Sequence, residues 1–202
     1  ITVEYTSTLN ENAKIGAEGN PNEMHLEYSN NPNDAQGGET GKTPDDKVIV
    51  FTYKTVINKV DEKNQPLKGA EFTLQKKVGN DWVNITRLTI TDETTFTFTG
   101  LDDGHYKLHE SKTPEEYNSI ADIEFDIDAT HEADSSDPKL LTLTGNVTTG
   151  QASFATEKDE NQKVTGSLTT NIVNKKGSSL PETGGMGTKI LYTLGVILVL
   201  GA

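Results

Sequence analysis

The sequence contains no cysteine, so no disulfide can stabilise its fold. It is also short of positive charge. Its 18 lysines and arginines stand against 31 aspartates and glutamates, which gives a formal net charge of -13. Such an excess of negative charge argues against a nucleic-acid partner and against binding to an anionic membrane surface. A well-solvated, exposed surface accounts for the acidity most simply.

Recognisable catalytic and metal-binding patterns are missing as well. The sequence shows no hydrolase triad and no paired catalytic carboxylates. The histidines do not have the spacing of metal ligands; they are His25, His105, His109 and His131. The acidic stretch Asp126–Asp128 lacks EF-hand spacing, and a solvated strand face explains it. We therefore expect neither an enzyme that turns over a substrate nor a metal or cofactor.

Long apolar runs are missing too, apart from the segment 190–202 at the end of the chain. A membrane-spanning helix needs about 20 apolar residues, so this run is too short as it stands. The chain also opens without methionine and without a signal peptide. We interpret the sequence as a fragment cut at both ends, the C-terminal portion of a longer exported protein.

What the sequence does contain is a series of short strand patterns between residues 53 and 175, separated by turn residues. The expected strands cover 53–59, 70–74, 82–90, 94–99, 106–110, 121–127, 140–143 and 166–174. Residues 128–138 and 145–165 are polar and are predicted as loops. This pattern predicts an all-β fold, an Ig-like antiparallel β-sandwich.

The first block, residues 1–52, has strand-like pieces at 1–9, 23–28 and 47–53. Residues 30–46 are rich in Asn, Gly, Pro and Thr and are predicted as a loop. We interpret residues 1–52 as the C-terminal part of a preceding β-rich domain and 53–175 as the next domain. Residues 176–202 form a linker and a terminal segment.

Three polar residues end apolar stripes that should face the core. Side chains alternate between the two faces of a strand. Lys59 therefore shares a face with Tyr53 and Ile57, Glu110 with Tyr106 and Leu108, and Asn174 with Leu168 and Ile172. Any one of them alone is more often a strand-end residue that reaches water. All three together call for a joint explanation.

The sequence around these residues resembles Cna B-type domains of Gram-positive surface proteins. The opening is Lys59-Val-Asp61 followed by Pro66-Leu-Lys-Gly-Ala-Glu-Phe72. Gly104-His-Tyr-Lys-Leu-His-Glu110, followed by Pro114 and Tyr117, resembles the conserved glutamate segment of that family. Ile172-Val-Asn174-Lys175 resembles its last strand. One departure is Glu116, where the family usually has glycine before the tyrosine.

This resemblance implies an intramolecular isopeptide bond between Lys59 and Asn174, assisted by Glu110. Burial favours the uncharged forms of the lysine and the glutamate, and a neutral amine is a nucleophile. A protonated Glu110 can polarise the Asn174 carboxamide and shuttle the proton that leaves with ammonia. In a chain without cysteine, such a bond would be a cross-link that needs no sulfur.

Near the end of the chain stand Leu180, Pro181, Glu182, Thr183 and Gly184, followed by a short spacer and the apolar run. This order resembles the sorting signal of proteins that sortase attaches to the Gram-positive cell wall. The resemblance implies cleavage between the threonine and the glycine. The threonine would then be joined to peptidoglycan or to a neighbouring pilin subunit, after a transient membrane tether through the apolar segment.

Together these resemblances imply the C-terminal part of a backbone (major) pilin on the cell surface. The partners would be sortase, neighbouring pilin subunits and peptidoglycan, with a host surface as a further candidate. The alternative is a wall-anchored adhesin or an accessory pilin that uses the same domain as a stalk. The first block could hold an isopeptide bond of its own, with Asn22, Asn30 or Asn31 as acceptor, although asparagines in such contexts usually form turns.

Overall fold

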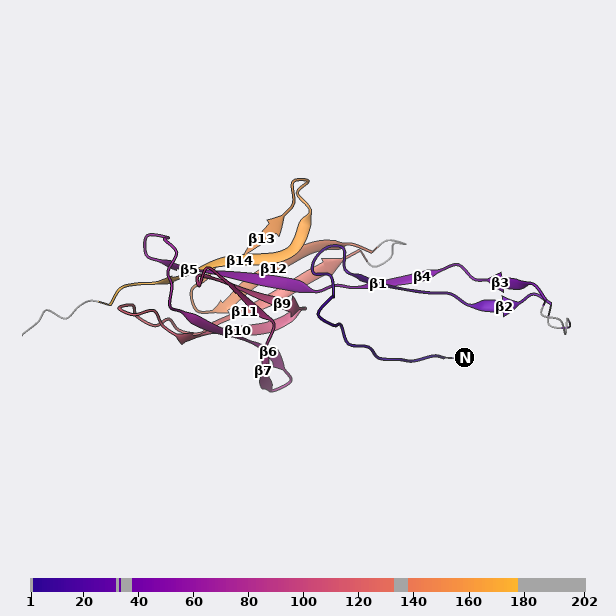
Figure 1. Cartoon of the computed structure of the whole chain (residues 1–202), viewed down its shortest axis with the longest axis horizontal. Helices are drawn as coiled ribbons and strands as arrows, with labels where there is room; N and C mark the ends of the chain where they lie inside the picture. Colours follow the sequence, from indigo (N-terminus) through magenta and orange to yellow (C-terminus); the bar gives the residue numbers. More distant parts are fainter. Residues whose placement is uncertain (1, 32, 34–37, 133–137, 178–202) are drawn as a thin grey trace, which may run out of the picture.

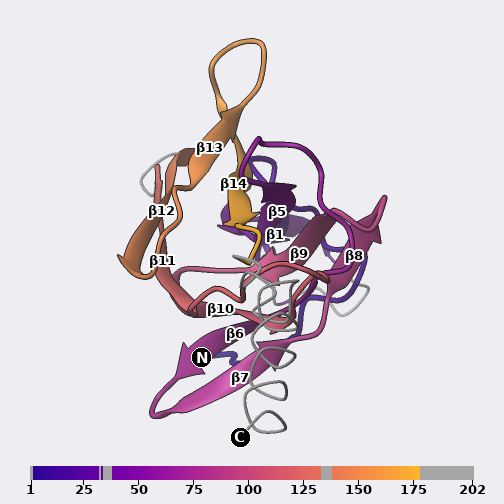
Figure 2. The same ribbon diagram turned by 90° about the vertical axis from the view of Figure 1, so that its left-hand side faces the viewer.

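The computed structural model describes residues 2–31, 33, 38–132 and 138–177. Two five-stranded sheets make up most of it (Figures 1 and 2). The first runs in the order β12 (Leu140–Thr149), β11 (Ile123–His131), β10 (Gly104–Lys112), β6 (Glu71–Val78) and β7 (Asp81–Ile85). The second runs in the order β13 (Ala155–Lys158), β14 (Val164–Asn174), β5 (Tyr53–Asp61), β9 (Thr95–Leu101) and β8 (Leu88–Thr91). The described residues contain no helix, so the expected all-β sandwich is confirmed.

The first and last strands of the sandwich, β5 and β14, lie side by side and run parallel. Every other pairing in the two sheets is antiparallel, so this pair departs from the purely antiparallel sandwich predicted from the sequence. The parallel register sets Lys59 opposite Ile172 and Asp61 opposite Asn174. The ends of β5 and β14 therefore meet at the same edge of the sandwich.

The core lies between the two sheets and follows the period of two that strands impose. Along β5 the residues facing inward are Tyr53, Thr55, Ile57 and Lys59, and all four are buried. The facing sheet contributes further inward side chains, which are Phe72, Leu74, Tyr106, Leu108, Ile123, Phe125 and Ile127. Burial of these aromatic and branched side chains, each worth about 1.5–3 kcal/mol, holds the layers together.

Two stretches predicted as loops prove to contain strands. β11 continues to His131, β12 runs on to Thr149, and β13 lies within 145–165. These parts were missed because their stabilisation comes from the β-ladder and from polar cross-strand pairs. For example, the Thr130 and Thr142 hydroxyls are 2.6 Å apart. A threonine-rich strand with a solvated face has no apolar stripe for a sequence pattern to detect.

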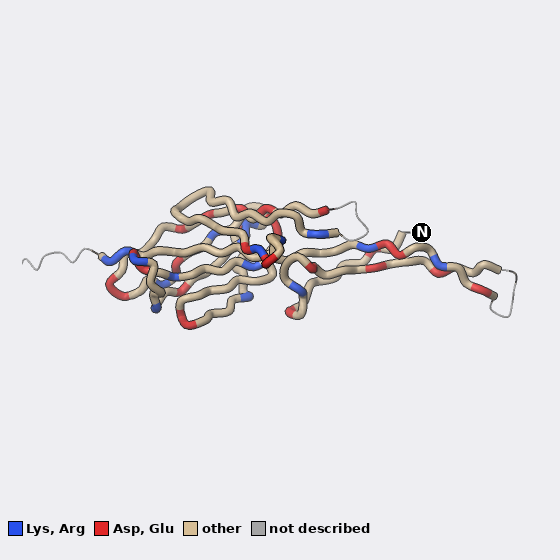
Figure 3. Tube along the Cα trace, turned by 90° about the horizontal axis from the view of Figure 1, so that it is seen from above, with Lys and Arg blue, Asp and Glu red and all other residues tan. Residues whose placement is uncertain are grey.

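Residues ahead of the sandwich form a long two-stranded ribbon that projects from one end of it (Figure 1). β1 (Asn20–Met24) pairs with β4 (Asp46–Val50), and further out β2 (Glu27–Ser29) pairs with β3 (Thr40–Lys42). β3 lies inside the segment predicted as a loop. The strand expected at 1–9 is not present over residues 2–9, which pair with no other strand. Acidic and basic residues are spread along both ribbon and sandwich (Figure 3).

Within the described ranges, no helix is long and apolar enough to cross a membrane. The apolar run 190–202 and the LPETG residues lie outside the described residues.

The segment before the ribbon is packed tightly against the sandwich at two glycines. The Gly16 N–H donates to the Thr52 carbonyl at 2.8 Å. Gly166 of β14 has a φ of +81°, and a Cβ added there would lie 2.2 Å from the Gly16 Cα. Only glycine fits this contact, because both the backbone conformation and the lack of space exclude a side chain.

We expect Gly166→Ala to destabilise the protein by more than about 1 kcal/mol, since it adds a backbone clash to conformational strain. Gly79→Ala is the matched control, because Gly79 has a φ of +60° and nothing within 4 Å of its added Cβ. Urea denaturation of both variants checks the prediction. Equal losses would mean that the contact between Gly16 and Gly166 does not contribute.

Candidate functional site

The two sheets bring Lys59, Glu110 and Asn174 together at the edge where β5 and β14 end. Lys59 and Asn174 come from these adjacent parallel strands, and Glu110 comes from β10 in the facing sheet. Lys59 and Asn174 are 0% exposed and Glu110 is 8% exposed. A lysine and a glutamate are almost never buried this deeply unless they are paired. The inward-facing positions expected from the strand patterns are therefore the observed ones.

The Lys59 amine touches the Asn174 carboxamide. Its Nζ lies 2.5 Å from Asn174 Oδ1 and donates to the Ile172 carbonyl at 2.9 Å. The 2.5 Å contact is closer than an ordinary N–H···O hydrogen bond. The nucleophilic atom of one residue is therefore in contact with the electrophilic group of the other, at a separation of 115 residues along the chain.

The other end of the carboxamide is held by two acceptors. Asn174 Nδ2 donates to Glu110 Oε2 and to the Asn118 carbonyl, both at 3.0 Å. Because a backbone carbonyl can only accept, its contact fixes which end of the carboxamide carries the nitrogen. From the sequence we expected Glu110 to polarise the carboxamide, but Glu110 contacts the nitrogen, and it is Lys59 that lies on the oxygen side.

Burial favours the reactive form of the lysine. Loss of hydration lowers the pKa of Lys59 to about 8, although the nearby Glu110 carboxylate acts in the opposite direction. At neutral pH about a tenth of the amine is then uncharged, far more than for a lysine in water. Glu110 Oε1 lies 3.8 Å from Lys59 Nζ. This Glu110 oxygen is buried and has no hydrogen-bond partner within the described part of the chain.

The turn after β10 contains Glu116, the residue that departs from the resemblance noted in the sequence. Glu116 has a φ of +68°, a left-handed conformation that favours glycine. Its carbonyl accepts from the Gly177 N–H at 3.0 Å, so the turn is held against the chain that follows β14. Glu116 therefore adopts the left-handed conformation of this turn, and it is not one of the three buried polar side chains.

The asparagines considered in the first block lie in a different environment. Asn22, Asn30 and Asn31 are all exposed, whereas Asn174 is fully buried. Asn22 donates to the Tyr5 hydroxyl at 2.8 Å. None of the three has the buried setting that lowers the pKa of Lys59.

Histidine ion pairs on the outer sheet surface were not foreseen from the sequence. His105 Nδ1 lies 2.6 Å from Asp126 Oδ1, and its Nε2 lies 3.2 Å from Glu124 Oε2. The hydrogen bond with Asp126 is the main reason why the pKa of His105 is raised. A register that sets His105 opposite Asp126 could have been found only with the strand pairing known. Among the described residues, no group of three or more acidic or histidine side chains is arranged to hold a metal.

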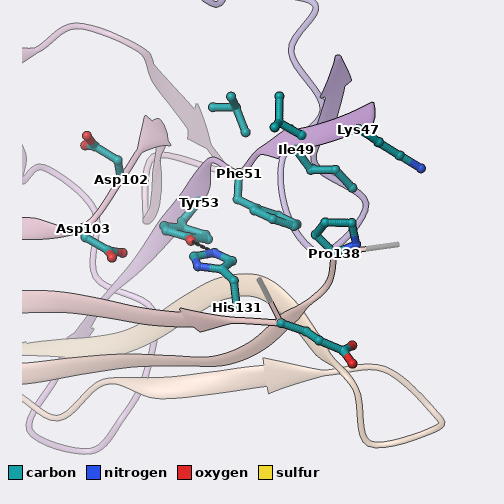
Figure 4. A pocket seen from close by; sticks show the side chains of 11 residues that line it. Lys47, Ile49, Phe51, Tyr53, Asp102, Asp103, His131 and Pro138 are labelled. Carbon is teal, nitrogen blue, oxygen red and sulfur yellow. Dashed lines mark hydrogen bonds between the residues drawn. The ribbon is translucent and has the colours of Figure 1, made fainter. Parts of the chain in front are cut away.

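An open hollow of about 520 Å³ separates the base of the ribbon from the sandwich (Figure 4). The His131 ring stacks on Phe51 with a centroid distance of 4.6 Å, and its Nε2 lies 2.7 Å from the Tyr53 hydroxyl. Burial raises the pKa of Tyr53. These contacts join β11 to the chain between the ribbon and β5. The hollow is therefore part of the junction and lies apart from Lys59 and Asn174.

Comparisons with known proteins agree with this fold. Residues 54–139 match the family described as SpaA, prealbumin-like fold domain. This range includes Lys59 and Glu110 and ends before Asn174. The trypsin-resistant surface T6 protein of Streptococcus pyogenes serotype M6 is 33% identical over 129 residues, which cover 57% of this chain and 23% of that protein.

Among solved structures, the T6 backbone pilin of serotype M6 Streptococcus pyogenes is similar with a TM-score of 0.52 at 22% identity. The match covers 84% of this chain and 46% of that one. A C-terminal fragment of the pilus adhesin SpaC from Lactobacillus rhamnosus GG has a TM-score of 0.45 at 17% identity, covering 79% and 60% of the two chains. The chain thus spans about a quarter of the T6 protein and less than half of its solved structure. At this identity, the likeness to the T6 pilin structure establishes the fold and not the function.

The lowered pKa of Lys59 predicts how stability depends on pH when no bond can form, as in Asn174→Ala. The pKa is about 8 in the folded state and 10.5 for an ordinary lysine, so between these values the unfolded chain binds more protons. The free energy of unfolding should then rise by on the order of 2 kcal/mol between pH 8 and pH 10. The cost of burying the charge is fully present below pH 8.

Urea denaturation across this range measures the effect. The matched control is Asn174→Ala combined with Lys59→Met, which keeps a long side chain but has no amine to titrate. The same pH dependence in both variants would contradict the lowered pKa.

Proposed function

We propose that Lys59 and Asn174 become joined by an isopeptide bond and that the domain is a covalently reinforced structural module. The observation that carries this proposal is the fully buried contact between the Lys59 amine and the Asn174 carboxamide, with a buried glutamate beside both. Burying an amine and a carboxylate costs several kcal/mol even when they pair. Conversion of the amine to a neutral amide removes part of that cost.

The reaction balances without any outside reagent. The lone pair on Lys59 Nζ attacks Asn174 Cγ, the Nζ–Cγ bond forms and the Cγ–Nδ2 bond breaks. The nucleophile loses one proton, the leaving nitrogen gains it, and ammonia departs. The products are one secondary amide and one ammonia. Because amine and carboxamide are held together, the step gains the large effective concentration of an intramolecular reaction.

Glu110 is placed to carry the proton. Its Oε1 is 3.8 Å from the attacking nitrogen, and its Oε2 accepts a hydrogen bond from the leaving nitrogen at 3.0 Å. A carboxylate between the two nitrogens can accept a proton from the first and deliver it to the second. Each chain reacts once, so Glu110 assists a single event of maturation and the protein is not an enzyme.

The position of the bond suits a module that bears tension. The ribbon precedes β5 at one end of the sandwich, and the chain leaves β14 at the opposite end (Figure 1). Because β5 and β14 run parallel, Lys59 and Asn174 both lie near this exit. Force would pass along β5 to Lys59 and through the new amide to Asn174. Residues 60–173, which lie between them in the sequence, would stay outside the loaded path.

We further propose that the chain is part of a structural subunit of a covalent pilus shaft, exported to the cell surface of a Gram-positive bacterium. The LPETG residues 180–184 with the following apolar run support sorting by sortase. The 33% identity to the T6 surface protein supports the class of protein. Its partners would be sortase, neighbouring pilin subunits and peptidoglycan, with a host surface as a further candidate.

A wall-anchored adhesin or accessory pilin is the second candidate. It would use the same domain as a stalk, and the shared sorting signal favours neither role. The two candidates differ in what Thr183 is joined to, which is a lysine of another subunit in a shaft and peptidoglycan in a singly anchored protein.

Intact mass spectrometry tests the isopeptide bond. The folded wild-type chain should weigh less than its sequence by one ammonia, and Glu110→Ala should restore the full mass. Closing a loop of this length is worth about 4–5 kcal/mol if the entropy estimate for disulfides applies, so Glu110→Ala should also lose stability. Glu116→Ala is the control, because this exposed carboxylate should be dispensable. A wild-type chain of full mass would refute the bond.

Wall digests of cells that express the full-length protein test the sorting proposal. We expect Thr183 as the new C-terminus, partly joined to a lysine of another subunit. Thr183→Ala should remain uncleaved and membrane-bound, whereas Thr188→Ala, outside the five-residue signal, should be processed normally. Deletion of 190–202 should release unpolymerised protein into the medium. Thr183 joined only to peptidoglycan peptides would reject the shaft role in favour of the wall-anchored adhesin.

A further inference from the structure

The two oxygens of the Glu110 carboxylate have different surroundings. Oε2 accepts from Asn174 Nδ2 at 3.0 Å and from the Thr113 hydroxyl at 3.1 Å. Oε1 has no hydrogen-bond partner among the described residues and lies 3.8 Å from Lys59 Nζ. The two oxygens are chemically equivalent, but a carboxylate whose plane turned freely would not keep one oxygen on the two donors and the other toward the amine. Something must therefore hold the plane of the Glu110 carboxylate. The Thr113 hydroxyl makes one such contact, in addition to the Asn174 carboxamide that takes part in the reaction.

Thr113 is itself held by a loop that closes over the end of the sandwich. Three residues after Glu110 the chain leaves β10, and the Tyr117 N–H donates to the Pro114 carbonyl at 3.2 Å. The Asn118 N–H then donates to the Lys175 carbonyl at 2.9 Å, directly after Asn174. The carbonyl of the same Asn118 accepts from Asn174 Nδ2. One loop therefore contacts both the glutamate and the leaving nitrogen.

We propose that Thr113 is a positioning residue for the isopeptide reaction, an inference that rests on the cross-linking function proposed above. Its hydroxyl donates to Oε2 and so keeps Oε1 free and directed toward the amine. With Oε2 occupied by two donors, Oε1 is the oxygen that takes the proton when Lys59 Nζ attacks. The Asn118 carbonyl holds the departing nitrogen beside the same carboxyl group, which then protonates it.

The reaction can be followed from its start with chain recovered unfolded in denaturant. Dilution begins folding, circular dichroism follows the fold, and intact mass follows the loss of one ammonia. We expect Thr113→Val, which has nearly the same shape but no hydroxyl, to fold and to lose ammonia about tenfold more slowly, as for the loss of one aligned hydrogen bond in the transition state. Thr113→Ser, which retains the hydroxyl, should react at close to the wild-type rate.

A second measurement separates positioning from a purely structural role. In the Asn174→Ala background no bond can form, so the free energy of unfolding with and without Thr113→Val reports only what the hydroxyl adds to the fold. The proposal is supported if Thr113→Val slows the loss of ammonia without lowering the free energy of unfolding in the Asn174→Ala background, and if Thr113→Ser restores the rate. A folded Thr113→Val that reacts at the wild-type rate, or a Thr113→Ser as slow as valine, overturns it.

If Thr113→Val does not fold, the rates of ammonia loss of wild type, Thr113→Ala and Thr113→Ser are compared instead. A slow Thr113→Ala beside a Thr113→Ser at the wild-type rate supports the proposal, and equal rates in all three overturn it. A wild-type chain that never loses ammonia would instead contradict the cross-linking function itself, and the two failures are therefore distinguishable.

Discussion

The structure depends on one contact, in which the amine of Lys59 meets the carboxamide of Asn174 inside a protein interior. A buried lysine is costly, and this cost limits what the surrounding fold can do. The fold must place a carbonyl and a carboxylate near the Lys59 amine. It must also provide hydrogen-bond acceptors for the nitrogen of the Asn174 carboxamide. The Ile172 carbonyl, Glu110 and the Asn118 carbonyl meet these needs. Among the side-chain atoms of Lys59, Glu110 and Asn174, Glu110 Oε1 is the buried one that has no hydrogen-bond partner in the described part of the chain.

The parallel pairing of β5 and β14 brings the two residues of this contact to one end of the sandwich. In an antiparallel pair, the end of one strand lies beside the start of the other. The C-terminal ends of two such strands would be too far apart to be joined at one end of the sandwich. Here both strands end together, at the edge opposite the ribbon (Figure 1). The loop 113–118 and residues 175–177 then close over the same edge through backbone hydrogen bonds. The buried contact, the ends of both strands and the closing loop therefore lie together where the chain leaves the sandwich, and in the proposed function tension would reach the domain at this same point.

The sequence predicted the part of this arrangement that depends on strand periodicity. Lys59, Glu110 and Asn174 each end an apolar stripe, and a period of two was enough to place them on the buried face. It did not predict the polar continuation of β12 or the strand β13, because threonine-rich strands are stabilised by cross-strand pairing that no local pattern records. Thr113 and the Asn118 carbonyl were also missed, since a hydroxyl on a turn and a backbone carbonyl have no sequence signal. The strand expected at 1–9 was wrong over its described residues, because alternation alone forms no sheet without a partner strand.

The most direct test of the central claim is tandem mass spectrometry of a tryptic digest of the folded wild-type domain. An amide on Lys59 blocks cleavage there, so the account predicts a branched peptide in which residues 55–63 are joined through Lys59 to Asn174 of residues 164–175, with one ammonia lost. Fragment ions should place the link on these two side chains. Recovery of residues 55–59, 60–63 and 164–175 only as separate linear peptides of full mass would contradict the claim that the buried contact matures into a bond.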